Sequence, residues 1–163
     1  MDFPNLRKEY YNGIHFMLDE MFTNDYDDNY TLSDNAMTKV VYDIDVNFSV
    51  EAFNQRDAEE IKYAFDKEIE NVDAVHDNYI ICRQKSLYEH STSIKKELPK
   101  SVPYEGAIQI VHGSSYSTNI PSTYFIATIE IENEIFVFQL IGKKDNMGYL
   151  YDDFIELLSS IEK

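Results

Sequence analysis

The sequence predicts an α+β domain in which an antiparallel β-sheet lies between helices, an α/β/α sandwich closed by a C-terminal helix. Segments with alternating apolar and polar residues follow one another along the chain, which favours pairing of neighbouring strands in antiparallel fashion. Two segments with apolar residues at helical spacing stand apart from them. The 163 residues contain neither internal repeats nor a linker, so we expect residues 1–163 to form a single domain.

Two strands are expected in the N-terminal third. A short first strand is predicted at GIHFML (13–18), which is mostly apolar. The segment TKVVYDIDVNF (38–48) is predicted to form one strand with a buried and a solvated face, because apolar and polar residues alternate along it. Its core-facing residues would be Val40, Tyr42, Ile44, Val46 and Phe48.

The middle of the chain predicts a helix, a strand and an ambiguous segment. RDAEEIKYAFDKEIENV (56–72) has apolar residues at helical spacing and acids in its first turn, where they interact favourably with the helix dipole. NYIICRQK (78–85) is expected to be a strand, because β-branched residues favour an extended backbone. LYEHSTSIKKELPK (87–100) fits either a loop with a short helix or a longer helix, and Pro99 ends it in both cases.

The last third predicts three strands and the closing helix. AIQIVHG (107–113) is a strand that ends at Gly113 and the polar residues after it. STYFIATIEI (122–131) and EIFVFQLIG (134–142) predict a hairpin, and the second strand is apolar on both faces, so we expect it to be central in the sheet. In YLYDDFIELLSSIEK (149–163) one helical stripe contains Leu150, Phe154, Leu157, Leu158 and Ile161.

The chain is strongly acidic. It has 30 Asp and Glu residues against 14 Lys and Arg, a formal net charge of −16. Such a charge repels nucleic acid and anionic membranes and speeds encounter with basic partners. We therefore expect binding to neither nucleic acid nor membrane. The acidity is concentrated in the first half, because residues 1–80 hold 19 acidic and 6 basic residues.

The single cysteine and the N-terminal residues indicate in which cellular compartment the protein is expected. Cys82 is the only cysteine, so an intrachain disulfide is impossible, and its apolar surroundings in YIIC predict a buried, unreactive thiol. The N-terminal MDFPNLRKEYY lacks the apolar core of a signal peptide, and no stretch is long and apolar enough to span a membrane. We expect a cytoplasmic protein, either a monomer or a weak dimer.

The sequence contains no recognised catalytic motif. GxGxxG, GxxxxGK[ST] and GxSxG are all absent, and the four histidines do not have the spacing of zinc ligands. An EF-hand loop starting at Asp25 would have Tyr30 in place of its glycine and Ala36 in place of its bidentate glutamate. His112 and the hydroxyls of HGSSYS follow a strand into a polar turn, which accounts for them without catalysis. We predict no enzymatic activity, no cofactor and no resident metal.

The stretch FTNDYDDNYTLSDN (22–35) gathers acidic residues without a compensating base. It could be a metal loop, a surface for a basic partner, or a solvated connector. Because the EF-hand pattern fails and tyrosines can anchor a partner at low entropic cost, a partner-facing or solvated loop is predicted. Spaced carboxylates could also mimic a phosphate backbone towards a nuclease. The predicted partner-binding residues are Asp25, Tyr26, Asp27, Asp28, Tyr30, Asp34, Asp43 and Asp45.

The C-terminal part of the chain resembles a known superfamily. Residues 124–163, an apolar hairpin, a short glycine-containing loop and a closing helix, resemble the end of PsbP-like domains, a superfamily that includes the photosystem PsbP proteins and the Ran-binding nuclear import factors. VYDIDVNFSVEAF (41–53) would match an early sheet strand, and the helix around Ile61 would match the one that packs on the sheet. The resemblance implies an antiparallel sheet between helices, a binding or accessory role, and no catalytic residues.

Small acidic α+β domains without an active site are typical of bacterial immunity proteins. We therefore predict a non-catalytic binding protein, an immunity protein or antitoxin that neutralises a cognate toxin, such as a contact-dependent or type VI secretion effector, by binding its basic surface. The alternative is a PsbP-like accessory or secretion-adaptor module that binds a peptide or helix of a protein partner in a groove. A third alternative is an enzyme without a recognisable motif.

Overall fold

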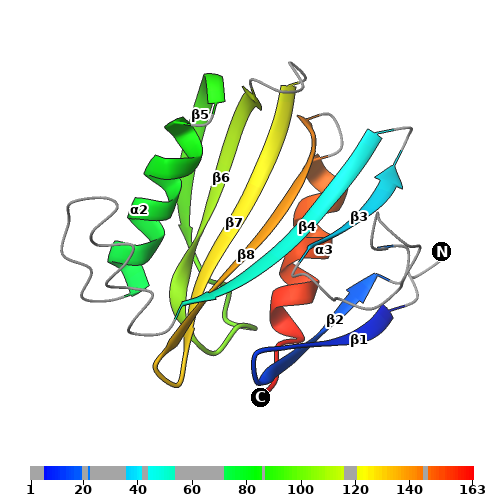
Figure 1. Ribbon diagram of the computed structural model, residues 1–163, viewed down its shortest axis with the longest axis vertical. Helices are drawn as coiled ribbons and strands as arrows, with labels where there is room; N and C mark the ends of the chain where they lie inside the picture. Colours follow the sequence, from blue (N-terminus) through cyan, green and yellow to red (C-terminus); the bar gives the residue numbers. More distant parts are fainter. Residues whose placement is uncertain are drawn as a thin grey trace.

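The computed structural model describes residues 6–19, 22, 36–41, 44–53, 72–85, 87–115, 121–144 and 147–163. These residues form eight strands and two helices, which are labelled in Figure 1. In chain order they are β1 (Leu6–Tyr11), β2 (Ile14–Asp19), β3 (Ala36–Val41), β4 (Ile44–Phe53), α2 (Val72–Lys85), β5 (Leu87–Glu97), β6 (Glu105–Ser115), β7 (Pro121–Ile131), β8 (Glu134–Lys143) and α3 (Met147–Ser159).

The strands form one large sheet and one separate hairpin. Six strands lie in the order β3-β4-β8-β7-β6-β5, and every neighbouring pair is antiparallel. Strands β1 and β2 pair only with each other among the described strands. Figure 1 shows α2 on one face of the large sheet and α3 on the other. The predicted α+β fold, with an antiparallel sheet between helices and a closing C-terminal helix, is confirmed.

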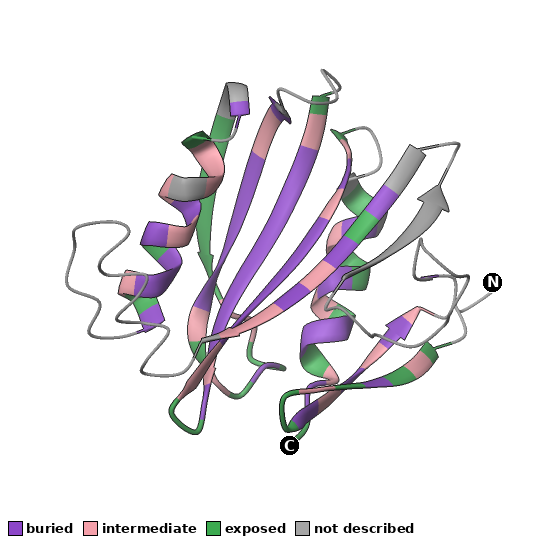
Figure 2. Ribbon diagram, in the orientation of Figure 1, coloured by how far each residue is buried: buried purple, intermediate pink, exposed green. Residues whose placement is uncertain are grey.

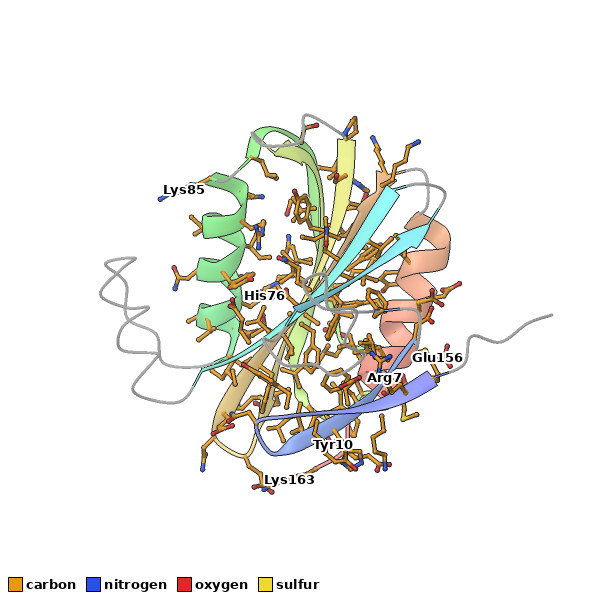
Figure 3. The ribbon with its side chains drawn as sticks, turned by 45° about the vertical axis from the view of Figure 1, so that its right-hand side comes forward. Arg7, Tyr10, His76, Lys85, Glu156 and Lys163 are labelled. Carbon is orange, nitrogen blue, oxygen red and sulfur yellow. The ribbon has the colours of Figure 1, made fainter. Side chains whose placement is uncertain are left out.

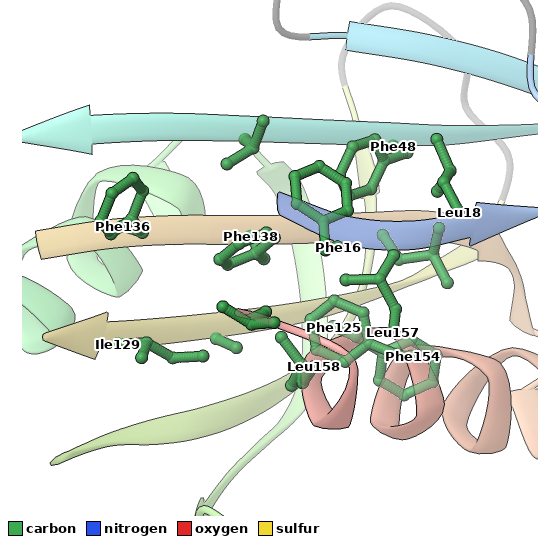
Figure 4. Packing of buried hydrophobic residues seen from close by; sticks show 14 of the residues in the cluster. Phe16, Leu18, Phe48, Phe125, Ile129, Phe136, Phe138, Phe154, Leu157 and Leu158 are labelled. Carbon is green, nitrogen blue, oxygen red and sulfur yellow. The ribbon is translucent and has the colours of Figure 1, made fainter. Parts of the chain in front are cut away.

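The larger core lies where α3 and the β1–β2 hairpin cover the sheet. Side chains of alternate residues in β7 and β8 meet this layer, and Figure 4 shows how their rings pack. The ring of Phe16 meets that of Phe138 edge to face at 5.5 Å, and Phe125 stacks on Phe154 at 5.9 Å. The apolar stripe predicted for the C-terminal helix is buried in this core at all its positions, Leu150, Phe154, Leu157, Leu158 and Ile161.

A smaller core lies on the opposite face, under α2. Ile80 of α2 packs there with residues of β7 and β8 that alternate with those of the larger core, including Ile126 and Val137. Both faces of β8 are therefore covered, as the apolar character of that strand predicted. Figure 2 shows β7 buried along most of its length and β5, at the edge of the sheet, largely exposed.

Two tight turns close the hairpins. Glu132 and Asn133 between β7 and β8 have φ angles of 47° and 70°, and Asn12 and Gly13 between β1 and β2 have 45° and 89°. Two consecutive positive φ angles are the signature of a type I′ turn, whose twist matches that of the flanking strands. The hairpin predicted at the C-terminal end is confirmed. Strand β2 confirms the short strand predicted at 13–18, while its partner β1 was not predicted.

The alternation in residues 38–48 predicted a single strand, and this prediction is wrong. These residues contribute to two strands, because Val41 of β3 pairs with Ile44 of β4 and the chain reverses between them. Alternation alone does not distinguish one long strand from a tight hairpin whose arms continue the same pattern. Val46 and Phe48 do face the core, as predicted.

The prediction of a strand at 78–85 is wrong, because these residues form the C-terminal part of α2. Val72, Val75, His76 and Ile80 are buried at helical spacing against β6 and β7. Tertiary packing of this face outweighs the strand preference of the β-branched residues. Cys82 lies in this helix, and its predicted burial stays a prediction. The helix predicted at 56–72 lies outside the described residues except for Val72.

Both alternatives for 87–100 are also wrong, since Leu87–Glu97 forms strand β5. It pairs with β6 and has no further neighbour among the described strands. An edge strand covered by little else can be polar on both sides, which hides its alternation. Thr92 to Glu97 are all exposed, and even Ile94 keeps 50% of its surface in solvent. Strand β6 also continues past Gly113 to Ser115.

Candidate partner-binding groove

Most of the predicted partner-binding residues lie outside the described residues. These are Asp25, Tyr26, Asp27, Asp28, Tyr30, Asp34 and Asp43. The remaining one, Asp45, lies in β4 opposite Val40 of β3. The role of all eight residues in binding stays a prediction.

The first residue of the acidic stretch, Phe22, packs into the larger core. Phe22 is buried, and its ring lies 6.1 Å from that of Phe48 in the larger core. Its backbone NH donates to the carbonyl of Asp19 at 3.1 Å, and its carbonyl accepts a hydrogen bond from Arg7 Nη2 at 3.0 Å. The acidic stretch therefore starts at a fixed point, beside the end of β2.

At this point lies a groove between the β1–β2 hairpin and α3, which we call the hairpin–helix groove. Figure 1 shows the hairpin and α3 on the same side of the sheet. Its wall and floor are mainly apolar and come from β1, β2, β8, α3 and the start of the acidic stretch. The apolar lining residues are Leu6, Met17, Leu18, Phe22, Leu140, Phe154 and Leu157.

Among the described residues, the charged ones that line the hairpin–helix groove are acidic. These residues are Asp19 at the end of β2 and Asp153 and Glu156 on α3. The two helix residues are exposed and three positions apart, which puts them on one helix face. Arg7 of β1 forms an ion pair with Glu9 and also donates to the carbonyl of Phe22. Figure 3 shows Arg7 and Glu156 on the same side of the molecule. A positive group of a partner would meet these carboxylates with the guanidinium of Arg7 beside them, because Arg7 Nη2 donates to the carbonyl of Phe22 in the groove lining.

Backbone contacts fix the hairpin against the end of the chain. The NH of His15 donates to the carbonyl of Glu162 at 2.7 Å, and the NH of Glu162 donates back to the carbonyl of His15 at 2.8 Å. The NH of Met17 donates to Ser160 Oγ at 2.8 Å. These bonds join the hairpin to residues 160–162, which directly follow α3, so they hold one wall of the groove against the end of the other.

A second polar feature is the fully buried His76 of α2. Its Nε2 lies 3.1 Å from Gln109 Oε1 and its Nδ1 lies 2.8 Å from Thr128 Oγ1. Gln109 Nε2 in turn donates to Ser93 Oγ at 2.6 Å, which leaves its Oε1 to accept from the His76 ring. The pKa of His76 is lowered, chiefly because burial disfavours the imidazolium, although the bond to Gln109 opposes this. The arrangement joins α2 to β6 and β7 of the sheet.

His112, the histidine of HGSSYS, lies in β6. Its Nδ1 is 2.7 Å from Thr123 Oγ1 on the neighbouring strand β7. Its pKa is lowered, first by burial and then by the charge of Lys144. Among the described residues, no group of three His, Cys, Asp or Glu side chains is placed to hold a metal ion. Neither described helix is long and apolar enough to cross a membrane.

Sequence reasoning missed the groove residues. Asn12-Gly13, between Tyr10-Tyr11 and the apolar run IHFML, is a hairpin signal, and it could have shown that β2 has a partner strand. The pair Asp153 and Glu156 stands beside the apolar stripe of the C-terminal helix and marks an acidic edge. Nothing in the local sequence places Asp19 next to that edge.

Comparison with solved structures gives a weak likeness. The structure is similar to the solution structure of cyanobacterial PsbP (CyanoP) from Synechocystis sp. PCC 6803, with a TM-score of 0.45 and 11% sequence identity over 99% of this chain and 94% of that chain. This protein bears the name of the superfamily that the C-terminal part of the sequence resembles. A likeness of this degree supports no inference about function. No protein-family model and no curated protein matches the sequence.

Proposed function

We propose that this chain is a non-catalytic binding protein that captures a basic protein partner, and that it serves as a bacterial immunity protein by neutralising a cognate toxin. The observation that supports this is the hairpin–helix groove, in which apolar side chains form the floor and the charged residues of the described lining are acidic. Apolar contact supplies affinity, while complementary charge supplies the rate of encounter and the choice of partner. A net charge of −16 adds a long-range field of the same sign.

Capture of the partner is the first experiment. The tagged protein is used to isolate binding proteins from cells that express its neighbouring genes, and each candidate is titrated by calorimetry. A one-to-one complex in which a toxin loses its activity supports the immunity function. The absence of any protein partner contradicts the proposal.

Reversing two groove charges should weaken this complex. In the double variant Asp153→Lys with Glu156→Lys, the dissociation rate should rise by about tenfold or more, because charged hydrogen bonds contribute about 1.5–3 kcal/mol each. The matched control is Glu97→Lys with Glu105→Lys, two exposed acids at the β5 side that change the net charge equally. The control should slow association at low salt and leave dissociation unchanged. Equal behaviour of both variants would remove the groove from the interface.

Charge reversal in the acidic stretch tests how much this stretch contributes to the electrostatic attraction of a basic partner. Replacing Asp25, Asp27 and Asp28 with lysine should slow association at low salt, with a smaller effect at high salt because screening shortens the range of the field. Stopped-flow association rates across a salt series measure this. Unchanged kinetics at low salt would show that the acidic stretch takes no part.

An adaptor or accessory protein is the second candidate function. The hairpin–helix groove favours it too, because an apolar site with acidic edges can bind a segment of a partner without inhibiting it. The two candidates differ in the state of the captured protein. A partner that keeps its activity in the complex, or that is a component of a secretion system, would favour the adaptor.

A further inference from the structure

We infer that the outer edge of β5 pairs with β5 of a second copy of this chain, so that two large sheets join as one across a two-fold axis. The inference is independent of the proposed function, because β5 contributes no residue to the described lining of the hairpin–helix groove. It is drawn from the exposure of β5, the direction of its lysines and the residue pairs that a two-fold axis would create.

The outer edge of β5 is a regular, exposed template for another strand. β5 is the last strand of the large sheet and has no neighbour beyond it among the described strands. Its pairing with β6 is irregular before Thr92 and regular from Thr92 to Glu97, and this whole stretch is exposed (Figure 2). The helix α2 packs chiefly over β6 and β7 rather than over β5. An exposed edge presents backbone N–H and C=O groups to which a further strand can add.

The lysines of this stretch do not guard the edge. Lysine side chains protect an edge strand when their charged ends project past it. Here the ammonium of Lys95 turns to one face of the sheet and lies 3.1 Å from Asp77 Oδ1 of α2. The ammonium of Lys96 lies 5.2 Å from the ring centre of Tyr151 on α3, at the other face. Both charges are held towards the helices, and Ile94, with 50% of its surface exposed, is the large apolar side chain left at the edge.

A two-fold axis at Ile94 gives a register without opposed like charges. Because the axis is perpendicular to the sheet, residues on the same face lie opposite one another in the two copies. Ile94 then meets Ile94 of the second copy, and their contact covers apolar surface that is exposed in the single chain. Ser93 lies opposite Lys95 of the second copy, and Thr92 lies opposite Lys96.

The neighbouring registers are less favourable. A two-fold axis at Lys95 or Lys96 would place that lysine opposite itself, and like charges directly opposite each other are destabilising. An axis shifted towards His90 would run into the irregular pairing between His90 and Thr92. The register centred on Ile94 is therefore the one that this edge favours.

Net charge and interface size predict a weak dimer that is strengthened by salt. Each copy has a net charge of −16, so the two copies repel each other at low ionic strength. Raising the salt from about 0.1 M to about 1 M shortens the Debye length from about 10 Å to about 3 Å. Pairing over Thr92–Lys96 is short and buries less surface than the roughly 1,200 Å² of a stable interface. Binding of a basic partner should respond to salt in the opposite direction.

Cysteine cross-linking tests the register directly. In a chain that carries Cys82→Ala, Ile94→Cys should form a covalent dimer on mild oxidation. Directly opposite residues have Cα atoms about 4.5–5.5 Å apart, and a disulfide spans about 4.4–6.8 Å. The matched control is Thr92→Cys, which is also exposed on β5, because two such sites would lie roughly 14 Å apart in this register. A mixture of Thr92→Cys and Lys96→Cys chains should cross-link, since these positions lie opposite each other.

Sedimentation equilibrium from about 10 µM to about 1 mM protein measures the association without a cross-link. The dimer fraction should rise with concentration and rise further with salt. Ile94→Lys places two like charges opposite each other and should lower the association constant about fivefold or more. The control Tyr10→Lys makes the same charge change at an exposed position of β1 and should not lower it.

Three results would each overturn the inference. They are a monomer at every concentration and salt, an Ile94→Lys variant that associates as the wild type does, and a Thr92→Cys chain that cross-links as fast as Ile94→Cys. None of them affects the proposed function, which fails instead if no basic partner is captured. The two failures are therefore distinguishable.

Discussion

Replacing Phe16 with alanine should lower the free energy of unfolding by about 3–5 kcal/mol, the usual cost of removing a buried phenylalanine. Phe16 has no exposed surface, and its ring contacts those of Phe48 and Phe138. It connects the β1–β2 hairpin to the large sheet, so the loss should loosen one wall of the hairpin–helix groove. Chemical denaturation measures the stability, and the affinity for the partner reports on the groove.

The control is Tyr10→Ala on the same hairpin. Tyr10 is 68% exposed, and exposed substitutions away from special features usually change stability by less than about 0.5 kcal/mol. A loss for Phe16→Ala no greater than that for Tyr10→Ala would show that the hairpin is not anchored through its aromatic core. Binding that is unaffected in the Phe16 variant would place the interface elsewhere.

The second large effect is expected from pH and depends on His76. Because burial lowers the pKa of His76 in the folded chain below its ordinary 6.5, the unfolded chain takes up a proton more readily. The contribution of neutral His76 to the free energy of unfolding is fully present above pH 6.5. It is lost as the pH falls through 6.5 towards the pKa of His76 in the folded chain. The loss amounts to about 1.4 kcal/mol for each unit by which the pKa is lowered. Lys95 of β5 also disfavours the cation, whereas Asp73 and Asp77 of α2 favour it.

Denaturation curves between pH 7.5 and pH 5 test this for the wild type and for His76→Gln. At pH 7.5 the variant should be less stable by about 1–3 kcal/mol, because Thr128 and Gln109 lose a buried partner. Its stability should decline less towards pH 5. The control His112→Gln should keep most of the decline, since His112 is partly exposed. An identical slope for wild type and His76→Gln would exclude His76 as the titrating group.

The local pattern of apolar and polar residues was enough to predict several elements of this protein. The apolar stripe of α3 and the β7–β8 hairpin were predictable, because each buries its own regular face and its side-chain period shows directly in the sequence. The fold class followed from these and from the order of the strands. The net charge of −16 likewise belongs to the sequence alone, and it determines the sign of the long-range field.

Only the tertiary structure decided the rest. Residues 78–85 have β-branched side chains that favour a strand, yet they are helical because the buried face of α2, centred on His76, fits β6 and β7. Strand β5 has no clear alternation, because an edge strand leaves both faces partly solvated. The hairpin–helix groove joins Asp19 to Asp153 and Glu156, residues more than a hundred positions apart. Local sequence records periodicity and charge, whereas the meeting of distant segments depends on how their buried faces pack together.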